Sequence, residues 1–173
     1  MKKKIFIITL LLLLTSCSEK ESYLYKKYGQ IIEVSNDYIV LDDKSFLTNQ
    51  VIIHTNIKNT FESGDFLEYY FDKEIEYINS IPNIYVTKLE KIDNPIGVGI
   101  FRYTTTDYFY NLKETNTSGR GVIDEYYELY DYEGKHIAWD SLVEDDLLLV
   151  YYSGYMQYGG INKYNPYYVA KCE

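Results

Sequence analysis

The chain has 173 residues and an acidic balance, with 17 basic against 26 acidic side chains and a formal net charge of −9. A protein of this charge is repelled by phosphate backbones, so the composition argues against nucleic-acid binding. Tyrosine is abundant, with 22 residues, whereas cysteine occurs only twice.

The N-terminal residues have the composition of a secretory signal peptide. Three lysines, Lys2 to Lys4, precede an apolar stretch from Ile5 to Leu14. As a helix this stretch would be about 15 Å long, half of the roughly 30 Å hydrocarbon core of a bilayer. We therefore expect residues 1–16 to be a cleaved signal peptide and not a transmembrane helix.

The end of this segment, Leu14-Thr15-Ser16-Cys17, resembles the lipobox of bacterial lipoproteins. The resemblance implies that the Cys17 sulfur receives a diacylglycerol, with its palmitate-type chains, and that the precursor is cleaved before this residue. Two acyl chains give stable anchoring at about 0.8 kcal/mol per buried CH₂. Residues 17–27 would then be the lipid anchor and a short tether at the cell membrane or outer membrane, on the extracytoplasmic side. The alternative is an ordinary signal peptide or anchor that happens to contain Cys17.

Removal of the signal peptide takes away Lys2, Lys3 and Lys4 and leaves 14 basic against 26 acidic side chains, a formal charge of −12. With Cys17 lipidated, only Cys172 is left, so no internal disulfide is expected. Cys172 is either a small buried residue at the end of the last strand or an exposed thiol that pairs with a partner.

From Tyr28 onward the pattern predicts strands, bounded by turn residues, and no stretch of 11 residues has a convincing helical period. In the first half we expect strands at 29–34, 38–41, 51–55, 66–71 and 84–89. In the second half we expect them at 100–106, 108–112, 122–132, 135–139, 147–152 and 167–172. The run 147–152 is apolar on both faces, which predicts the most buried strand. Turns are expected at Glu133-Gly134, Ser153-Gly154 and Gly159-Gly160.

Two parts of the chain resemble each other. Residues 63–77 (SGDFLEYYFDKEIEY) are similar to residues 144–158 (EDDLLLVYYSGYMQY), and each is followed by a proline-containing loop and a short strand. This predicts a mostly β fold of one or two small antiparallel barrel-like units, 28–92 and 98–172, with one continuous domain as the alternative. The Gly-led hairpin at 29–41, the Gly64-Asp65 turn and the final loop and strand resemble small OB-like domains of lipoproteins from low-GC Gram-positive bacteria. The resemblance implies a barrel-like fold.

No catalytic or metal-binding signature stands out. His54 and His136 have no second ligand at metal-binding spacing, and the chain lacks a Gly-x-Ser-x-Gly turn. Gly97-Val98-Gly99 has no Walker-type lysine. We therefore assign no catalytic residue and expect neither a metal nor a cofactor.

The remaining feature is a concentration of tyrosines near the C-terminus, where a ring can offer an apolar face and a polar tip to a partner. Tyr155, Tyr158, Tyr164 and Tyr167 are the candidate binding aromatics, with packing in the core as the alternative. We expect Tyr164 and Tyr167 to flank Pro166 in a loop and to be more exposed than Tyr151 and Tyr152.

These features predict a lipid-anchored, extracytoplasmic binding or interaction module of the bacterial cell envelope, whose partner is an envelope protein or a glycan. One alternative is a small cell-wall or glycan-directed enzyme, which would gather perturbed carboxylates or a histidine in a cleft. Another is a passive structural lipoprotein with neither a cleft nor an aromatic patch.

Overall fold

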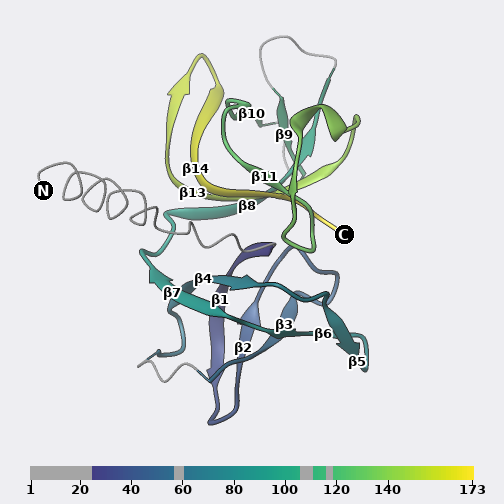
Figure 1. Cartoon of the computed structure of the whole chain (residues 1–173). Coiled ribbons are helices and arrows are strands. Elements are labelled where there is room, and N and C mark those ends of the chain that lie inside the picture. Colours follow the sequence, from purple (N-terminus) through teal and green to yellow (C-terminus); the bar gives the residue numbers. More distant parts are fainter. Residues whose placement is uncertain (1–24, 57–60, 106–110, 116–118) are drawn as a thin grey trace, which may run out of the picture.

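The computed structural model describes residues 25–56, 61–105, 111–115 and 119–173. The predicted signal peptide, Cys17 and residues 18–24 of the predicted tether lie outside these ranges. The prediction that the tether extends to residue 27 is wrong, because residues 25–27 belong to strand β1 and Lys27 is buried. The described residues form two sheets and one short 3₁₀ turn, η1 (Trp139–Ser141), which confirms the predicted mostly β fold (Figure 1). None of their helical segments is long and apolar enough to cross a membrane.

The first sheet contains the strands of the N-terminal half, in the order β5-β6-β3-β2-β1-β4-β7. β1, β2 and β3 form an antiparallel meander, β4 pairs with β1, and β6 runs parallel to β3. The strands are β1 (Tyr25–Val34), β2 (Tyr38–Asp42), β3 (Gln50–His54), β4 (Phe66–Phe71), β5 (Glu76–Ile78), β6 (Ile81–Tyr85) and β7 (Lys88–Ile92).

The last two strands of this sheet are one run of chain that passes from one edge of the sheet to the other. At the bend between them, the Val86 amide donates to the carbonyl of His54 on β3, at 3.0 Å. The next amide, that of Thr87, donates to the carbonyl of Tyr70 on β4, at 2.9 Å. The segment 81–92 therefore runs from β3 on one side of the sheet to β4 on the other, and it gives this half of the chain a barrel-like curvature. The single strand predicted at 84–89 is wrong, because this segment must leave β3 in order to reach β4.

The second sheet is a closed five-stranded barrel with a small additional hairpin. β8, β9 and β10 form a meander, β13 pairs with β8, and β14 pairs with both β13 and β10, to which it runs parallel. The pairing of β10 with β14 closes the barrel. Its strands are β8 (Gly97–Tyr103), β9 (Leu112–Glu114), β10 (Arg120–Val122), β13 (Leu147–Tyr158) and β14 (Ile161–Lys171), and the hairpin is β11 (Leu129–Tyr130) and β12 (His136–Ile137).

The two sheets share one connectivity. In each, a three-strand meander is followed by a strand that pairs with the first strand of the meander, and the final run of chain lies next to the third. The similar sequences 63–77 and 144–158 fall on equivalent strands, β4 and β13. The internal similarity in the sequence therefore has a structural counterpart (Figure 1).

Three sequence-based expectations in the second half are wrong. The strand predicted at 122–132 is interrupted after Val122 by a turn that leads into β11. β13 continues through Ser153-Gly154, where a turn was expected, and β14 continues through Pro166, where a loop was expected. The register of the β13–β14 pair shifts on both sides of Tyr152, and these bulges accommodate Pro166, which lacks an N–H group. The Gly159-Gly160 turn is confirmed, with both residues at positive φ.

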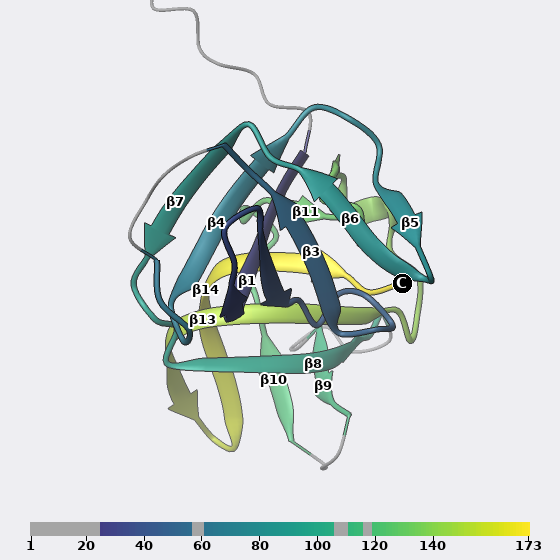
Figure 2. The same ribbon diagram turned by 90° about the horizontal axis from the view of Figure 1, so that it is seen from below.

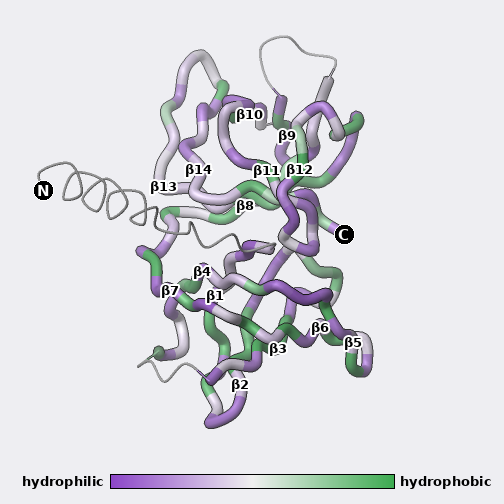
Figure 3. The backbone as a smooth tube through the Cα atoms, viewed as in Figure 1, coloured by the Kyte–Doolittle hydropathy of each residue, from purple (hydrophilic) through white to green (hydrophobic). Residues whose placement is uncertain are grey.

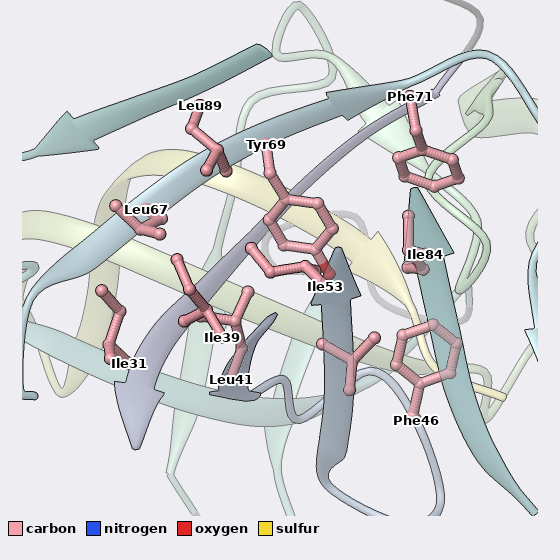
Figure 4. Close-up of a cluster of buried hydrophobic side chains, with 11 residues drawn as sticks. Ile31, Ile39, Leu41, Phe46, Ile53, Leu67, Tyr69, Phe71, Ile84 and Leu89 are labelled. Carbon is pink, nitrogen blue, oxygen red and sulfur yellow. The ribbon is translucent and has the colours of Figure 1, made fainter. Parts of the chain in front are cut away.

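Each unit has its own apolar core, and a third cluster lies between the units. The core of the first unit includes Ile53, Leu67 and Tyr69 (Figure 4). The turn between β1 and β2, at the far end of this unit, consists of hydrophilic residues (Figure 3). The core of the second unit lies inside the closed barrel. The third cluster joins Tyr28 and Phe66 of the first sheet to Tyr130, Leu149, Tyr151, Tyr168 and Ala170 of the second.

β13 is buried on both faces along its first half, as its sequence predicts. Leu148 and Val150 point into the barrel core, whereas Leu149 and Tyr151 belong to the cluster between the units. Figure 2 shows β13 and β14 crossing behind β1 at this contact. One strand therefore supplies side chains to both the barrel core and the contact between units.

A buried ion pair lies beside this cluster. Lys27 Nζ is 3.1 Å from Asp43 Oδ2, and both side chains are fully buried. The Lys27 ammonium also donates to Ser45 Oγ at 2.6 Å and to the carbonyl of Tyr132, which belongs to the second half of the chain. Asp43 accepts a further hydrogen bond from the hydroxyl of Tyr69, at 2.8 Å. The pair thus links the first sheet to the loop that connects β11 and β12.

A second set of polar and aromatic contacts at the junction surrounds Lys26. Its ammonium lies 5.3 Å from the ring centroid of Tyr28 and 6.0 Å from that of Tyr130, on the opposite sheet. It also pairs with Glu68, which accepts a hydrogen bond from the hydroxyl of Tyr28. Burial alone would raise the pKa of Glu68, but these hydrogen bonds reverse the effect and lower it.

Truncation of either leucine at the centre of β13 should destabilise the protein. We expect Leu148→Ala and Leu149→Ala each to lower the free energy of unfolding by about 2–5 kcal/mol, because both side chains are fully buried. Denaturant titration measures the effect, and Leu47→Ala, at a side chain that is 76% exposed, is the matched control. If Leu149→Ala unfolds at the same denaturant concentration as the wild type, the contact between units contributes little to stability.

Candidate binding groove

Four aromatic rings gather where β8, β13 and β14 meet at one end of the closed barrel. The ring centroid of Tyr164 lies 5.0 Å from that of Phe101, 4.9 Å from that of Tyr152 and 6.0 Å from that of Tyr155. Tyr155 and Tyr164 are register partners on the β13–β14 hairpin. Adjacent strands therefore place these rings beside one another.

An open groove of about 460 Å³ lies against this cluster. Its volume is in the range of roughly 300–1,000 Å³ that is typical of small-molecule sites. The lining combines rings with polar groups and exposed backbone, and it includes Lys44, Gly99, Phe101, Glu114, Tyr152 and Tyr164.

Two glycines of β8 allow the rings to approach the strand closely. A Cβ atom at Gly97 would lie 2.3 Å from the Tyr152 ring, and one at Gly99 would lie 2.5 Å from the Phe101 ring. Neither distance is compatible with a side chain unless a ring moves. These two glycines therefore allow the Tyr152 and Phe101 rings to pack against β8.

A short series of polar side chains borders the rings. The Tyr164 hydroxyl donates to Glu114 Oε1 at 3.4 Å, and the Asn162 amide nitrogen donates to the Tyr164 hydroxyl at the same distance. Asn162 Oδ1 is buried and has no hydrogen-bond partner among the described residues. Carboxylate, hydroxyl and amide groups thus stand next to aromatic faces at the groove.

The electrostatics of the groove keep its phenols protonated. Burial raises the pKa of both Tyr152 and Tyr164, and the negative charge of Glu114 raises both further. At neutral pH these hydroxyls can therefore donate hydrogen bonds, while the carboxylate of Glu114 accepts them.

The groove also reaches the first unit. Lys44 lies in the loop between β2 and β3, next to the buried Asp43, and its ammonium pairs with Asp42 at 2.9 Å. The relative placement of the two units therefore sets one wall of the groove.

The four candidate tyrosines differ in their surroundings. Tyr155, Tyr158 and Tyr167 are exposed, at 55%, 67% and 46% of their surface, respectively. Tyr164 is only 5% exposed, so the prediction that it is an exposed loop residue is wrong. It lies within the continuous strand β14 and points into the barrel. For Tyr167, the predicted exposure relative to Tyr151 is confirmed.

Only two of these tyrosines belong to the groove cluster. Tyr155 and Tyr164 meet there, whereas Tyr158 contacts the sulfur of Met156 near the hairpin turn and Tyr167 lies farther along β14. Phe101 and Glu114 were not identified from the sequence. The sequence signal for their position is the pair Gly97 and Gly99, because a glycine within a strand often marks a close approach of another group.

The two histidines and Cys172 make packing and hydrogen-bond contacts with other residues of the fold. His54 stacks on Tyr85 and forms a 3.0 Å hydrogen bond with Asn83, while His136 meets the ring of Tyr130 edge-on. The described ranges contain no group of three or more His, Cys, Asp or Glu side chains that could hold a metal ion. Burial raises the pKa of the Cys172 thiol to about 11, which keeps it protonated and weakly reactive at neutral pH.

Comparison with known proteins found no matching family model, no similar curated protein and no similar solved structure. The functional argument therefore depends on the chain and on its groove.

Proposed function

We propose that this protein is a lipid-anchored, extracytoplasmic binding module of the bacterial cell envelope, and that the groove beside β8 receives its ligand. The observation that carries the proposal is the set of Phe101, Tyr152 and Tyr164 rings next to the Glu114 carboxylate. Concave sites that combine aromatic walls with a few fixed polar groups are typical of ligand recognition.

The lining favours binding over hydrolysis. Glycoside hydrolysis generally uses two carboxyl groups about 5–10 Å apart. Among the described residues that line the groove, Glu114 is the only carboxylate. A binding module is therefore a better match than the small glycan-directed enzyme, and the groove distinguishes it from a passive structural lipoprotein.

The position of β1 limits where the ligand can be. β1 begins at Tyr25, eight residues after Cys17, and eight residues span at most about 28 Å. With a diacylglyceryl group on Cys17, the module would stay close to the bilayer. Its ligand would then be an envelope component, an extracytoplasmic glycan or protein.

The anchor can be tested by substitution of the lipidated residue. Cys17→Ser should abolish labelling by a palmitate analogue and leave the precursor uncleaved, because serine cannot form the thioether. Cys172→Ser is the matched control and should label like the wild type. Undiminished labelling of Cys17→Ser would contradict the lipobox assignment.

The binding role can be tested by hydrogen exchange on the full chain in detergent, with and without envelope fractions. We expect either isolated cell-wall polymer or extracted envelope proteins to protect backbone amides around residues 97–101 and 152–155. Tyr152→Ala, at a ring that lines the groove, should reduce this protection, whereas Tyr167→Ala, at an exposed ring away from the groove, should not. Absence of protection with every fraction would contradict the binding function.

A further inference from the structure

We propose that the ligand of the groove is a neutral oligosaccharide. This inference rests on the proposed function and names the ligand class for the same site. It follows from the pairing of aromatic faces with hydroxyl and carboxylate groups, together with the acidic charge of the protein.

The rings match the apolar faces of sugar rings. Tyr152 is partly exposed and Tyr155 is 55% exposed, and their rings meet nearly perpendicularly with centroids 6.4 Å apart. Perpendicular rings offer one flat face and one edge to the C–H groups of a pyranose. Because aromatic residues have few rotatable bonds, little conformational entropy is lost on contact.

The polar groups match sugar hydroxyls. Glu114 supplies a charged acceptor beside the rings, and hydrogen bonds to an ionised group are roughly twice as strong as neutral ones. The Tyr164 and Thr115 hydroxyls also line the groove; they donate to Glu114 and to the carbonyl of Ile100, and their oxygens can accept further hydrogen bonds. Sugar hydroxyls can donate to these acceptors.

The charge distribution selects against anionic ligands. The precursor carries a net charge of −9, and Glu114 places a negative charge in the groove itself. Among the described residues that line the groove, Lys44 is the one cation, and it is paired with Asp42. Phosphate-bearing polymers would therefore be repelled, whereas uncharged sugars would not.

A folded protein partner is the less favourable occupant. A stable protein–protein contact covers about 800 Å² on each partner. The groove is a local concavity of about 460 Å³ with a mixed aromatic and polar lining, which suits a few sugar rings better than a broad protein surface.

The test is isothermal titration calorimetry on the full chain in detergent. The probes are two neutral tetrasaccharides, chitotetraose and cellotetraose, and an anionic control, short-chain polyphosphate. We expect at least one neutral probe to bind with micromolar to millimolar affinity, and polyphosphate not to bind. Binding of polyphosphate in preference to both sugars would overturn the proposal.

Substitutions place the sugar in the groove. Tyr152→Ala and Glu114→Gln, both at residues that line the groove, should each weaken sugar binding about tenfold or more. Tyr158→Ala, at a more exposed ring near the hairpin turn, should bind like the wild type. Circular dichroism and thermal unfolding confirm that each variant is folded. Unchanged affinity in both groove variants would refute the assignment.

The two proposals fail in different ways. If neither sugar binds while envelope proteins still protect residues 97–101 from exchange, the binding function stands and the sugar assignment is wrong. If neither sugar binds in calorimetry and no envelope fraction protects these residues from exchange, both proposals are wrong.

Discussion

The buried ion pair between Lys27 and Asp43 is the interaction on which the arrangement of the two units depends. Removal of two charges from water costs several kcal/mol per ion, and the pair is tolerated only when further hydrogen bonds satisfy it. Here Asp43 Oδ1 accepts from the amide and hydroxyl of Ser45, and Asp43 Oδ2 accepts from Tyr69. Burial lowers the pKa of Lys27, and Asp43 opposes this shift. Every partner must therefore be in place for the pair to be stable.

These partners come from both halves of the chain, so the pair specifies how the units meet. Tyr132, whose carbonyl accepts from Lys27, lies in the hairpin loop after β11. Gly134 closes that loop at φ +90°, and a Cβ atom there would lie 2.5 Å from Lys27 Cγ. Only a glycine allows the loop to approach the lysine so closely. Apolar packing around Leu149 stabilises the contact between the units, whereas the ion pair fixes the orientation in which they meet.

The same geometry extends to the groove. Lys44 follows Asp43 directly, so the loop that supplies the buried carboxylate also supplies one side of the groove. β13 connects the two regions, since its Leu149 and Tyr151 pack at the junction and its Tyr152 lines the groove. A change in the packing of the units would therefore alter the groove without any substitution in its aromatic lining.

The sequence was sufficient to predict the strands with strong alternation and clear turns. The hairpin at 29–41, the strand at 66–71 and the buried run at 147–152 follow from apolar patterning and turn residues. Pro166 and Ser153-Gly154 misled the prediction, because bulges in a long antiparallel pair absorb residues that would otherwise end a strand. The groove could not be predicted in full. Phe101 and Glu114 reach it only through barrel closure, and the burial of Tyr164 depends on which face of β14 is turned inward.

The most direct test of this account is a double-mutant cycle on the buried pair, measured by denaturant unfolding of the full chain in detergent. Lys27→Met should cost about 3–5 kcal/mol, because it leaves the Asp43 carboxylate buried without its cation. The double variant Lys27→Met/Asp43→Asn, compared with the two single variants, should give a coupling energy between the two side chains of at least about 2 kcal/mol. Lys163→Met, which breaks the exposed pair with Asp124, should cost less than about 1 kcal/mol. A cost for Lys27→Met no larger than that for Lys163→Met would contradict the central role of the buried pair.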